Sequence, residues 1–270
     1  MRRRTLLAGI IGTGLLAGCT GVSSDTEGGS DTPESDFALR EIDFPETVES
    51  NQEWRWSATI ENTGTEPGTS HFHAFVRLPG NEMDHIASIT LTLEPGEAGV
   101  FESPPEKRTY TTTHEYQFMH SDAVASVNVV PANLVVGDAY RTPNDIVLTV
   151  LDVDLREEYS FQDVMGNEQT RSADPGYQWA FITVDARNER EHRTTLPRRE
   201  DLTLHHAGEA YDHTILQQKE GAYRARTVDP GSGRTGWIAF EVPEDVAIGE
   251  LIVEYAGSDR DGPWGATWQA

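Results

Sequence analysis

Short runs of β-branched and aromatic residues, separated by turn-forming residues, follow one another from Phe37 to the C-terminal region of the chain. No long stretch repeats its apolar residues with the 3.6-residue period of an amphipathic helix. The runs are interrupted at Asn62-Thr63-Gly64, Pro79-Gly80-Asn81 and Pro95-Gly96, which are turn-forming sequences. Many short strands with frequent turns are typical of sandwiches and barrels. The pattern therefore predicts an all-β fold.

The candidate strands fall into two groups that resemble each other in number and length. In the first half they are 37–44, 54–62, 71–78, 87–93, 99–102, 112–118 and 125–130, and in the second half 146–154, 179–188, 202–205, 223–228, 236–242 and 250–255. About seven short strands over roughly 100 residues are expected of an immunoglobulin-like sandwich. We therefore predict two such domains, a first β-sandwich at 37–131 and a second at 132–257, followed by a C-terminal tail at 258–270.

The two halves also share a local sequence pattern. SATIENTGTEP at 57–67 and ITVDARNEREH at 182–192 are each a strand that runs into an asparagine and then a polar turn. LTLEPGEAGVFESP at 91–104 and RTVDPGSGRTGWIAFEVP at 226–243 each place an acidic-Pro-Gly turn before an aromatic-bearing strand. The second copy carries an insertion between the two elements. The repetition predicts two related domains.

The second half resembles the domain-of-unknown-function family 4352, an immunoglobulin-like module. The matching stretches are VGDAYRTPNDIVLTVLDVD (136–154), YQWAFITVDARNE (177–189), LTLHHAGEAYD (202–212) and DPGSGRTGWIAFEVPED (229–245). The first half loosely resembles adhesion-type bacterial domains with a strand–Asn-x-Gly–strand–Pro-Gly core. Both resemblances imply a β-sandwich with an unassigned binding or scaffolding role, and neither supplies catalytic residues or a cofactor.

The N-terminal residues have the features of an export signal. A basic segment containing Arg3 and Arg4 precedes a short apolar stretch, and the motif around the arginines resembles a twin-arginine signal. Leu16-Ala17-Gly18-Cys19 resembles the lipobox of prokaryotic lipoproteins, in which the cysteine receives a lipid, and Cys19 is the single cysteine. We predict a signal peptide at 1–18, a lipidated flexible tether at 19–36, and location on the extracellular face of the cell membrane. An uncleaved N-terminal anchor is the alternative.

The formal net charge of −24 limits the classes of partner. So large an excess of acid disfavours nucleic acid and anionic lipid head groups. Only Lys107 and Lys219 are lysines. Because molar salt shortens the Debye length to about 3 Å, such a surface suits a salt-adapted protein and resembles secreted proteins of haloarchaea. An ordinary acidic extracellular protein is the alternative.

Histidines offer the strongest chemical alternative to a simple binding role. His71 and His73 lie two residues apart on a candidate strand, so both side chains point to one face. With His85, His114, His120 and Met119 in the same domain, they are candidates for a copper or zinc site. Histidines in a lysine-poor chain can equally be surface polar groups.

We therefore expect a non-enzymatic surface lipoprotein without a cofactor. Its lipid on Cys19 would attach it to the membrane, and its sandwich loops would contact an envelope protein or another surface ligand. A metal-binding lipoprotein that uses His71 and His73 is the alternative. Trp264 and Trp268, in the predicted tail, either form an exposed contact patch or fold back onto the second domain.

Overall fold

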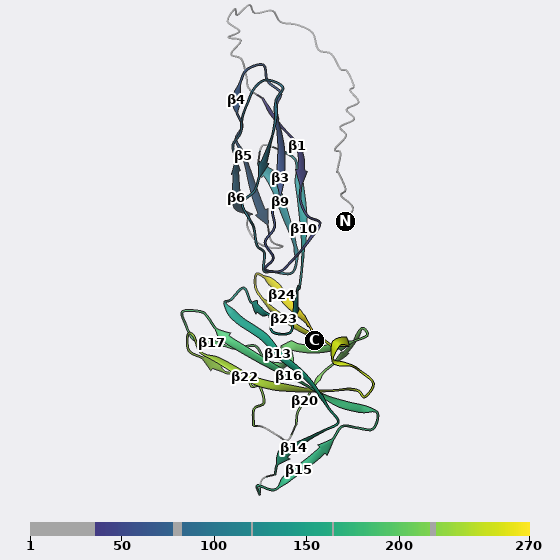
Figure 1. The fold of residues 1–270 in the computed structure, drawn as a ribbon. Helices are drawn as coiled ribbons and strands as arrows, with labels where there is room; N and C mark the ends of the chain where they lie inside the picture. Colours follow the sequence, from purple (N-terminus) through teal and green to yellow (C-terminus); the bar gives the residue numbers. More distant parts are fainter. Residues whose placement is uncertain (1–35, 78–82, 120, 164, 217–219) are drawn as a thin grey trace, which may run out of the picture.

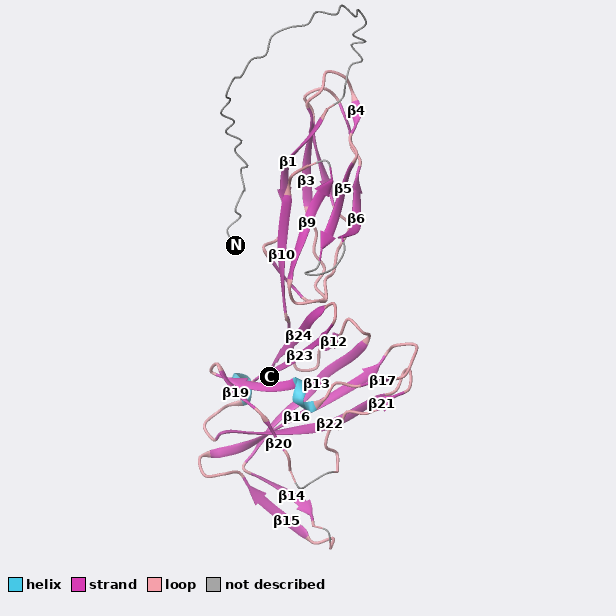
Figure 2. Ribbon diagram, turned by 180° about the vertical axis from the view of Figure 1, so that it is seen from behind, coloured by secondary structure: helices cyan, strands magenta, loops and turns pink. Residues whose placement is uncertain are grey.

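The structure, a computed structural model, describes residues 36–77, 83–119, 121–163, 165–216 and 220–270. Over these ranges the secondary structure consists of β-strands and two single-turn 3-10 helices. Figures 1 and 2 show two sandwiches arranged end to end, with a small hairpin projecting from the far side of the second. Each sandwich encloses its own apolar core. The predicted all-β fold of two sandwich domains is confirmed.

The first domain is a sandwich of a three-stranded and a five-stranded sheet, ordered β1-β3-β8 and β2-β10-β9-β5-β6. All neighbours are antiparallel except β2 and β10, which run parallel. The strands are β1 (Phe37–Asp43), β2 (Thr47–Glu49), β3 (Ser57–Asn62), β4 (Gly68–Thr69), β5 (Phe72–Arg77), β6 (Met83–Ile89), β7 (Thr92–Leu93), β8 (Ala98–Glu102), β9 (Thr113–Met119) and β10 (Val124–Val130). The short β4 and β7 pair separately.

The second domain repeats this plan with two five-stranded sheets, β11-β24-β23-β18-β19 and β12-β13-β16-β22-β20. Its first strand, β11, again runs parallel to its last, β24. The elements are β11 (Ala132–Val135), β12 (Ala139–Arg141), β13 (Ile146–Arg156), β14 (Glu158–Gln162), β15 (Glu168–Ser172), β16 (Tyr177–Asn188), β17 (Thr194–Thr195), η1 (Arg199–Asp201), β18 (Leu202–His206), β19 (Glu209–Tyr211), β20 (His213–Thr214), β21 (Thr227–Val228), β22 (Gly233–Pro243), η2 (Ile248–Glu250), β23 (Ile252–Asp259) and β24 (Gly262–Gln269).

The C-terminal tail predicted at 258–270 is instead part of the second sandwich. Residues 262–269 form β24, which lies between β11 and β23 inside a sheet. Trp264 and Trp268 point into the core, and Trp268 has no exposed surface. The glycines suggested a loose end, but the alternation of Trp264, Ala266 and Trp268 buries every second side chain. Of the two alternatives for the tryptophans, packing onto the second domain is the observed one.

A hairpin that the sequence analysis missed covers the outer face of one sheet of the second domain. Strands β14 and β15 pair with each other, and Tyr159 of β14 packs with Trp179 and Phe181 of β16 in a small apolar cluster. Strand β16 is therefore buried on both faces from Trp179 to Ile182, which explains the continuous apolar run at these positions. The strand expected at 223–228 shrinks to β21, because only Thr227 and Val228 pair with β17.

The internal repeat is visible in the hydrogen bonds of two fully buried asparagines, Asn62 and Asn188. The Asn62 amide donates to the carbonyl oxygens of Glu66 at 2.8 Å and Leu93 at 3.0 Å, and its Oδ1 accepts from Gly64 N–H at 3.0 Å. Each donor and acceptor of this side chain thus ties the end of β3 to the following turn and to β7.

Asn188 makes the corresponding bonds in the second domain. Its amide donates to the carbonyls of His192 at 2.9 Å and Val228 at 3.3 Å, and its Oδ1 accepts from Arg190 N–H at 3.0 Å. In both domains the Pro-Gly turn closes onto the asparagine, because the amides of Gly96 and Gly231 donate to the Asn62 and Asn188 carbonyls at 2.8 Å. Both glycines adopt positive φ, +75° and +71°. The two sandwiches therefore share this arrangement of a buried asparagine bonded to a Pro-Gly turn, which we call the asparagine clamp.

The two sandwiches contact each other where β10 leads into β11. Tyr110 of the first domain packs against Trp264 with ring centroids 6.2 Å apart, and Thr111 N–H donates to the Pro263 carbonyl at 2.8 Å. Ser50 Oγ lies 3.2 Å from the Tyr140 hydroxyl. These bonds involve backbone and buried side chains, so the domains are joined by a packed junction as well as by the chain.

Candidate functional site

The outer face of the five-stranded sheet in the first domain is the most distinctive surface of that domain. Along β5, the side chains of Phe72, Ala74 and Val76 are buried between the sheets. His73, Phe75 and Arg77 therefore point outward, because successive side chains of a strand alternate between its faces. On the neighbouring β9, Gln117 and Met119 point outward in the same way.

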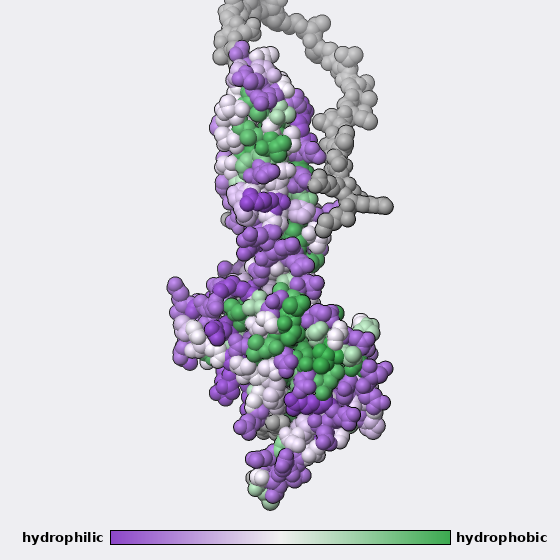
Figure 3. Space-filling view, in the orientation of Figure 1, coloured by the Kyte–Doolittle hydropathy of each residue, from purple (hydrophilic) through white to green (hydrophobic). Residues whose placement is uncertain are grey.

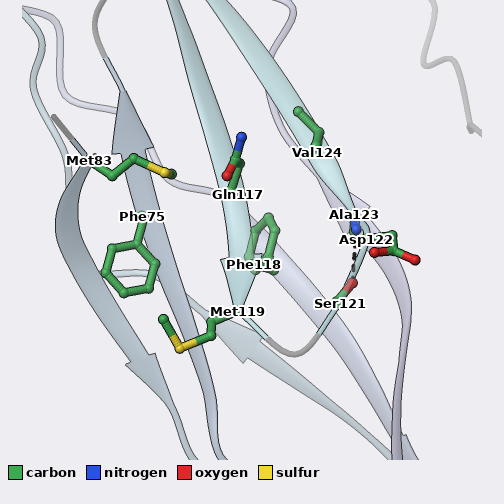
Figure 4. A pocket seen from close by; sticks show the side chains of 9 residues that line it. All are labelled: Phe75, Met83, Gln117, Phe118, Met119, Ser121, Asp122, Ala123 and Val124. Atoms are coloured by element: carbon green, nitrogen blue, oxygen red, sulfur yellow. Dashed lines mark hydrogen bonds between the residues drawn. The ribbon is translucent and has the colours of Figure 1, made fainter. Parts of the chain in front are cut away.

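A concavity of about 520 Å³ lies on this face, beside the turn between β9 and β10 (Figure 4). Its lining residues are Phe75, Met83, Gln117, Phe118, Met119, Ser121, Asp122, Ala123 and Val124. In Figure 4 the Phe75 ring lies between the thioethers of Met83 and Met119. Met119 and Val124 are 48% and 57% exposed. Figure 3 shows apolar areas that interrupt the otherwise polar surface of the first domain.

The chemistry of this concavity suits binding. Its walls are aromatic, thioether and aliphatic, and Asp122 is the one charged residue among the lining residues described. Exposed methionines adapt their shape to a partner, and apolar patches on a charged protein mark interaction sites. The surface can therefore accept an apolar group, with a carboxylate at its rim.

This surface was not predicted from the sequence, although one signal was present. Phe72 and Phe75 are three residues apart, and a strand places such residues on opposite faces. One of the two phenylalanines must therefore be exposed on the outer face. The methionines join it only through cross-strand pairing, which pairs Arg77 with Met83 and His73 with Met119.

The structure places His73 beside His85 on the same outer face, rather than in a described contact with His71. Strand pairing sets His73 opposite Ser88, and the rings of His73 and His85 lie 5.4 Å apart. Ser88 Oγ is 3.1 Å from His73 Nδ1 and 3.2 Å from His85 Nε2. His71 precedes β5 and is exposed. The two histidines that lie together are therefore His73 and His85, from two strands, and not the predicted pair of His71 and His73.

The other histidines of the domain do not complete that arrangement. His114 points to the core side of β9, where its Nε2 lies 3.1 Å from the Tyr110 carbonyl oxygen. Burial lowers the pKa of its imidazole and so favours the neutral ring. His120 lies outside the described residues. Where the structure describes the chain, no three His, Cys, Asp or Glu side chains come together in a way that could hold a metal.

The predicted export and anchoring residues, Arg3, Arg4 and Cys19, lie outside the described residues, as do the signal peptide and most of the tether. In the described ranges, the structure has no helix with the length and apolar character needed to span a membrane.

Comparison with known proteins finds a family that the second domain resembles. Residues 136–262 match the model of a family described as Domain of unknown function (DUF4352). The resemblance of the second half to this family is thereby confirmed, whereas the haloarchaeal and lipoprotein character stays a prediction. No curated protein matches the chain.

Solved structures share the general β architecture. The yjhA protein from Bacillus subtilis is 14% identical with a TM-score of 0.39, and the match covers 50% of this chain and 98% of that one. An uncharacterized β-sandwich protein from Clostridium difficile 630 is 13% identical with a TM-score of 0.33, covering 51% and 93%. The secreted protein MPT63 from Mycobacterium tuberculosis is 18% identical with a TM-score of 0.35, covering 52% and 98%. Likenesses this distant have no bearing on function.

Proposed function

We propose that this protein is an exported lipoprotein with a non-enzymatic role, and that its first domain binds a protein partner at the cell envelope. The observation that carries the binding role is the apolar concavity bordered by Phe75, Met83, Met119 and Val124. Its volume of about 520 Å³ is in the range of binding pockets, about 300–1,000 Å³. Because it opens on the face of a sheet, it suits an apolar side chain presented by another protein.

The strongly acidic composition supports a specific partner. A net charge of −24 opposes self-association and nonspecific binding to acidic envelope components. An apolar area on such a surface therefore selects a partner that brings an apolar group and a neutral or basic rim. In high salt, where charge is screened, apolar contacts of this kind keep their strength.

The proposed location follows from the N-terminal sequence. A basic segment with Arg3 and Arg4, a short apolar stretch and a lipobox ending at Cys19 occur in the order that a lipoprotein signal requires. The acidic, Gly- and Ser-containing residues 20–36 would then act as a tether that holds the sandwiches away from the bilayer. A salt-adapted extracellular environment fits the same composition.

Replacing Cys19 by serine is expected to release most of the protein from the cell into the medium. The lipid is the proposed membrane attachment, and each methylene that it buries contributes about 0.8 kcal/mol. Fractionation of cells and medium, followed by immunoblotting, measures the distribution. Thr20→Ser is the matched control, because it changes a neighbouring side chain and leaves the thiol; it should stay with the membrane. Continued membrane retention of the Cys19→Ser variant would contradict lipid anchoring.

The binding role is tested by a photo-crosslinking amino acid placed at Val124 in intact cells. Val124 borders the concavity and is exposed, so a partner seated there should give a discrete crosslinked product. Asn128 is the control position, because it is also exposed on β10 but is not among the residues that line the concavity. Equal crosslinking at both positions, or none at Val124, would show that the concavity is not the binding surface.

A further inference from the structure

Two imidazoles on the outer face of the first domain are held by one hydroxyl group. Ser88 Oγ lies 3.1 Å from Nδ1 of His73 and 3.2 Å from Nε2 of His85. The hydroxyl thus engages one nitrogen of each ring and leaves the second nitrogen of each available to a ligand. Hydrogen bonds that orient an imidazole in this manner are the usual surroundings of metal-binding histidines.

The separation of the two rings also suits a shared metal ion. Their centroids are 5.4 Å apart and the rings are tilted by 59°. Metal–imidazole bonds of about 2.0–2.1 Å place the centroids of two rings that share one tetrahedral ion roughly 5 Å apart. The observed separation of 5.4 Å therefore matches that of two imidazole ligands of one ion.

A thioether completes the set from the third strand. Met119 is the direct cross-strand partner of His73 on β9, so the two side chains lie on the same face, with Cβ atoms about 4.5–5.5 Å apart. Met119 is 48% exposed. Figure 4 shows its sulfur beside the Phe75 ring, and that ring packs edge-on against His85 with centroids 5.4 Å apart. The Phe75 ring thus lies beside both His85 and Met119, on the face that it shares with His73.

The ligand types select the metal. Within the residues that the structure describes, no third His, Cys, Asp or Glu joins the two histidines. Zinc favours four ligands from these residue types, and calcium and magnesium need oxygen ligands. Imidazole together with a soft thioether favours copper(I). We propose that His73, His85 and Met119 form a copper(I) site on the outer face of the first domain.

This proposal goes beyond the envelope-binding role and does not depend on it. Ser88 is a positioning residue, because it fixes both rings and contributes no metal bond. His71, the other member of the pair suggested by the sequence, has no part in the site.

The test is an anaerobic titration of the purified full-length protein with copper(I) in competition with a chromogenic chelator. One equivalent is expected to bind. His73→Ala and His85→Ala should each lose binding by more than a hundredfold, and Met119→Leu, which keeps the size of the side chain, by at least tenfold. Ser88→Ala should weaken binding by about 10–100-fold, the usual effect of losing an orienting partner. His71→Ala, a matched change of an exposed histidine, should bind as the parent does.

Absence of stoichiometric copper would overturn the proposal, as would copper binding that is unchanged in Met119→Leu or zinc(II) binding tighter than copper(I) binding. Circular dichroism of each variant checks that the fold is kept. If a histidine variant fails to fold, Met119→Leu decides the question, with sulfur scattering in the copper X-ray absorption spectrum as the second readout. The crosslinking experiment at Val124 uses a different residue and readout, so either proposal can fail while the other stands.

Discussion

Removing residues 260–270 is expected to unfold the second domain and to leave the first domain folded. The deletion takes away β24, which hydrogen-bonds to β11 on one side and β23 on the other, so the sheet would be split. It also removes the buried Trp264 and Trp268 from the core. Truncating one such side chain costs about 3–5 kcal/mol, and a whole domain has a free energy of unfolding of about 5–15 kcal/mol. The loss therefore exceeds what the domain can tolerate.

Limited proteolysis with thermal unfolding measures this effect. The truncated protein should give a protease-resistant fragment of the first domain, since that domain has its own core around Trp56, Tyr116 and Phe118. Trp268→Ala should shift the same transition by about 3–5 kcal/mol, partly because it also breaks the 2.9 Å bond from its indole N–H to the Asp138 carbonyl. Met165→Ala is the control, because Met165 is 84% exposed. Full resistance of the truncated protein would mean that β24 is dispensable.

Replacing either buried clamp asparagine by alanine is expected to destabilise its own domain by about 2–4 kcal/mol. Alanine leaves two carbonyl oxygens and one N–H without their partner; a fully buried group left unsatisfied costs about 1–3 kcal/mol, and a part-buried one costs less because water reaches it. For Asn62 these groups belong to Glu66, Leu93 and Gly64. The equivalence of the two clamps implies that Asn188→Ala costs a similar amount in the second domain.

Denaturant unfolding followed by tryptophan fluorescence measures both variants, since each core contains tryptophan. Asn62→Asp separates hydrogen bonding from packing, because aspartate has nearly the same size but lacks the two amide donors; it should be at least as destabilising as alanine. Asn128→Ala, at an exposed strand position, should change stability by less than about 0.5 kcal/mol. A change that small at Asn62 would mean that the clamp does not hold the turn.

The same clamps show how much of the fold can be predicted from sequence. The strand-to-asparagine pattern at 57–67 and 182–192, with its Pro-Gly turns, correctly indicates two sandwiches built alike. These features are local, since the turn conformation and the alternation of side chains are set within a few residues. The bonds from Asn62 to Leu93 and from Asn188 to Val228 span 31 and 40 residues. Their presence follows from the pattern only once the two strands are known to be neighbours.

One structural prediction was wrong and one hairpin was not predicted, because glycine in the first case and polar residues in the second mask strand character. Strand β24 contains Gly262 and Gly265, and the sequence analysis read it as part of a loose tail. Strands β14 and β15 are rich in exposed polar residues, so their pairing was not predicted. In both cases the stabilising contacts come from segments that are distant in the sequence. Strand β24 is stabilised by strands on both sides, and the hairpin by the apolar cluster around Trp179.

The arrangement of the candidate site depends even more on which strands pair and in which register. His73 was singled out by its spacing from His71, but it lies beside His85 because β5 pairs with β6 in a shifted register. Met119 joins it because β9 pairs with β5 on the other side. Spacing along one strand identifies residues that share a face, whereas residues on different strands meet only through register.

The sequence by itself determined the all-β class, the two related sandwiches, the family resemblance of the second half and the predicted address at Cys19. These depend on local propensity, periodicity and short motifs, which a few neighbouring residues specify. Only the tertiary structure decided that the C-terminal residues close a sheet, that Phe75 lies half-buried between two methionines, and that His73 lies beside His85 and opposite Met119. Strand order and register bring these residues together, and they depend on how the whole chain packs.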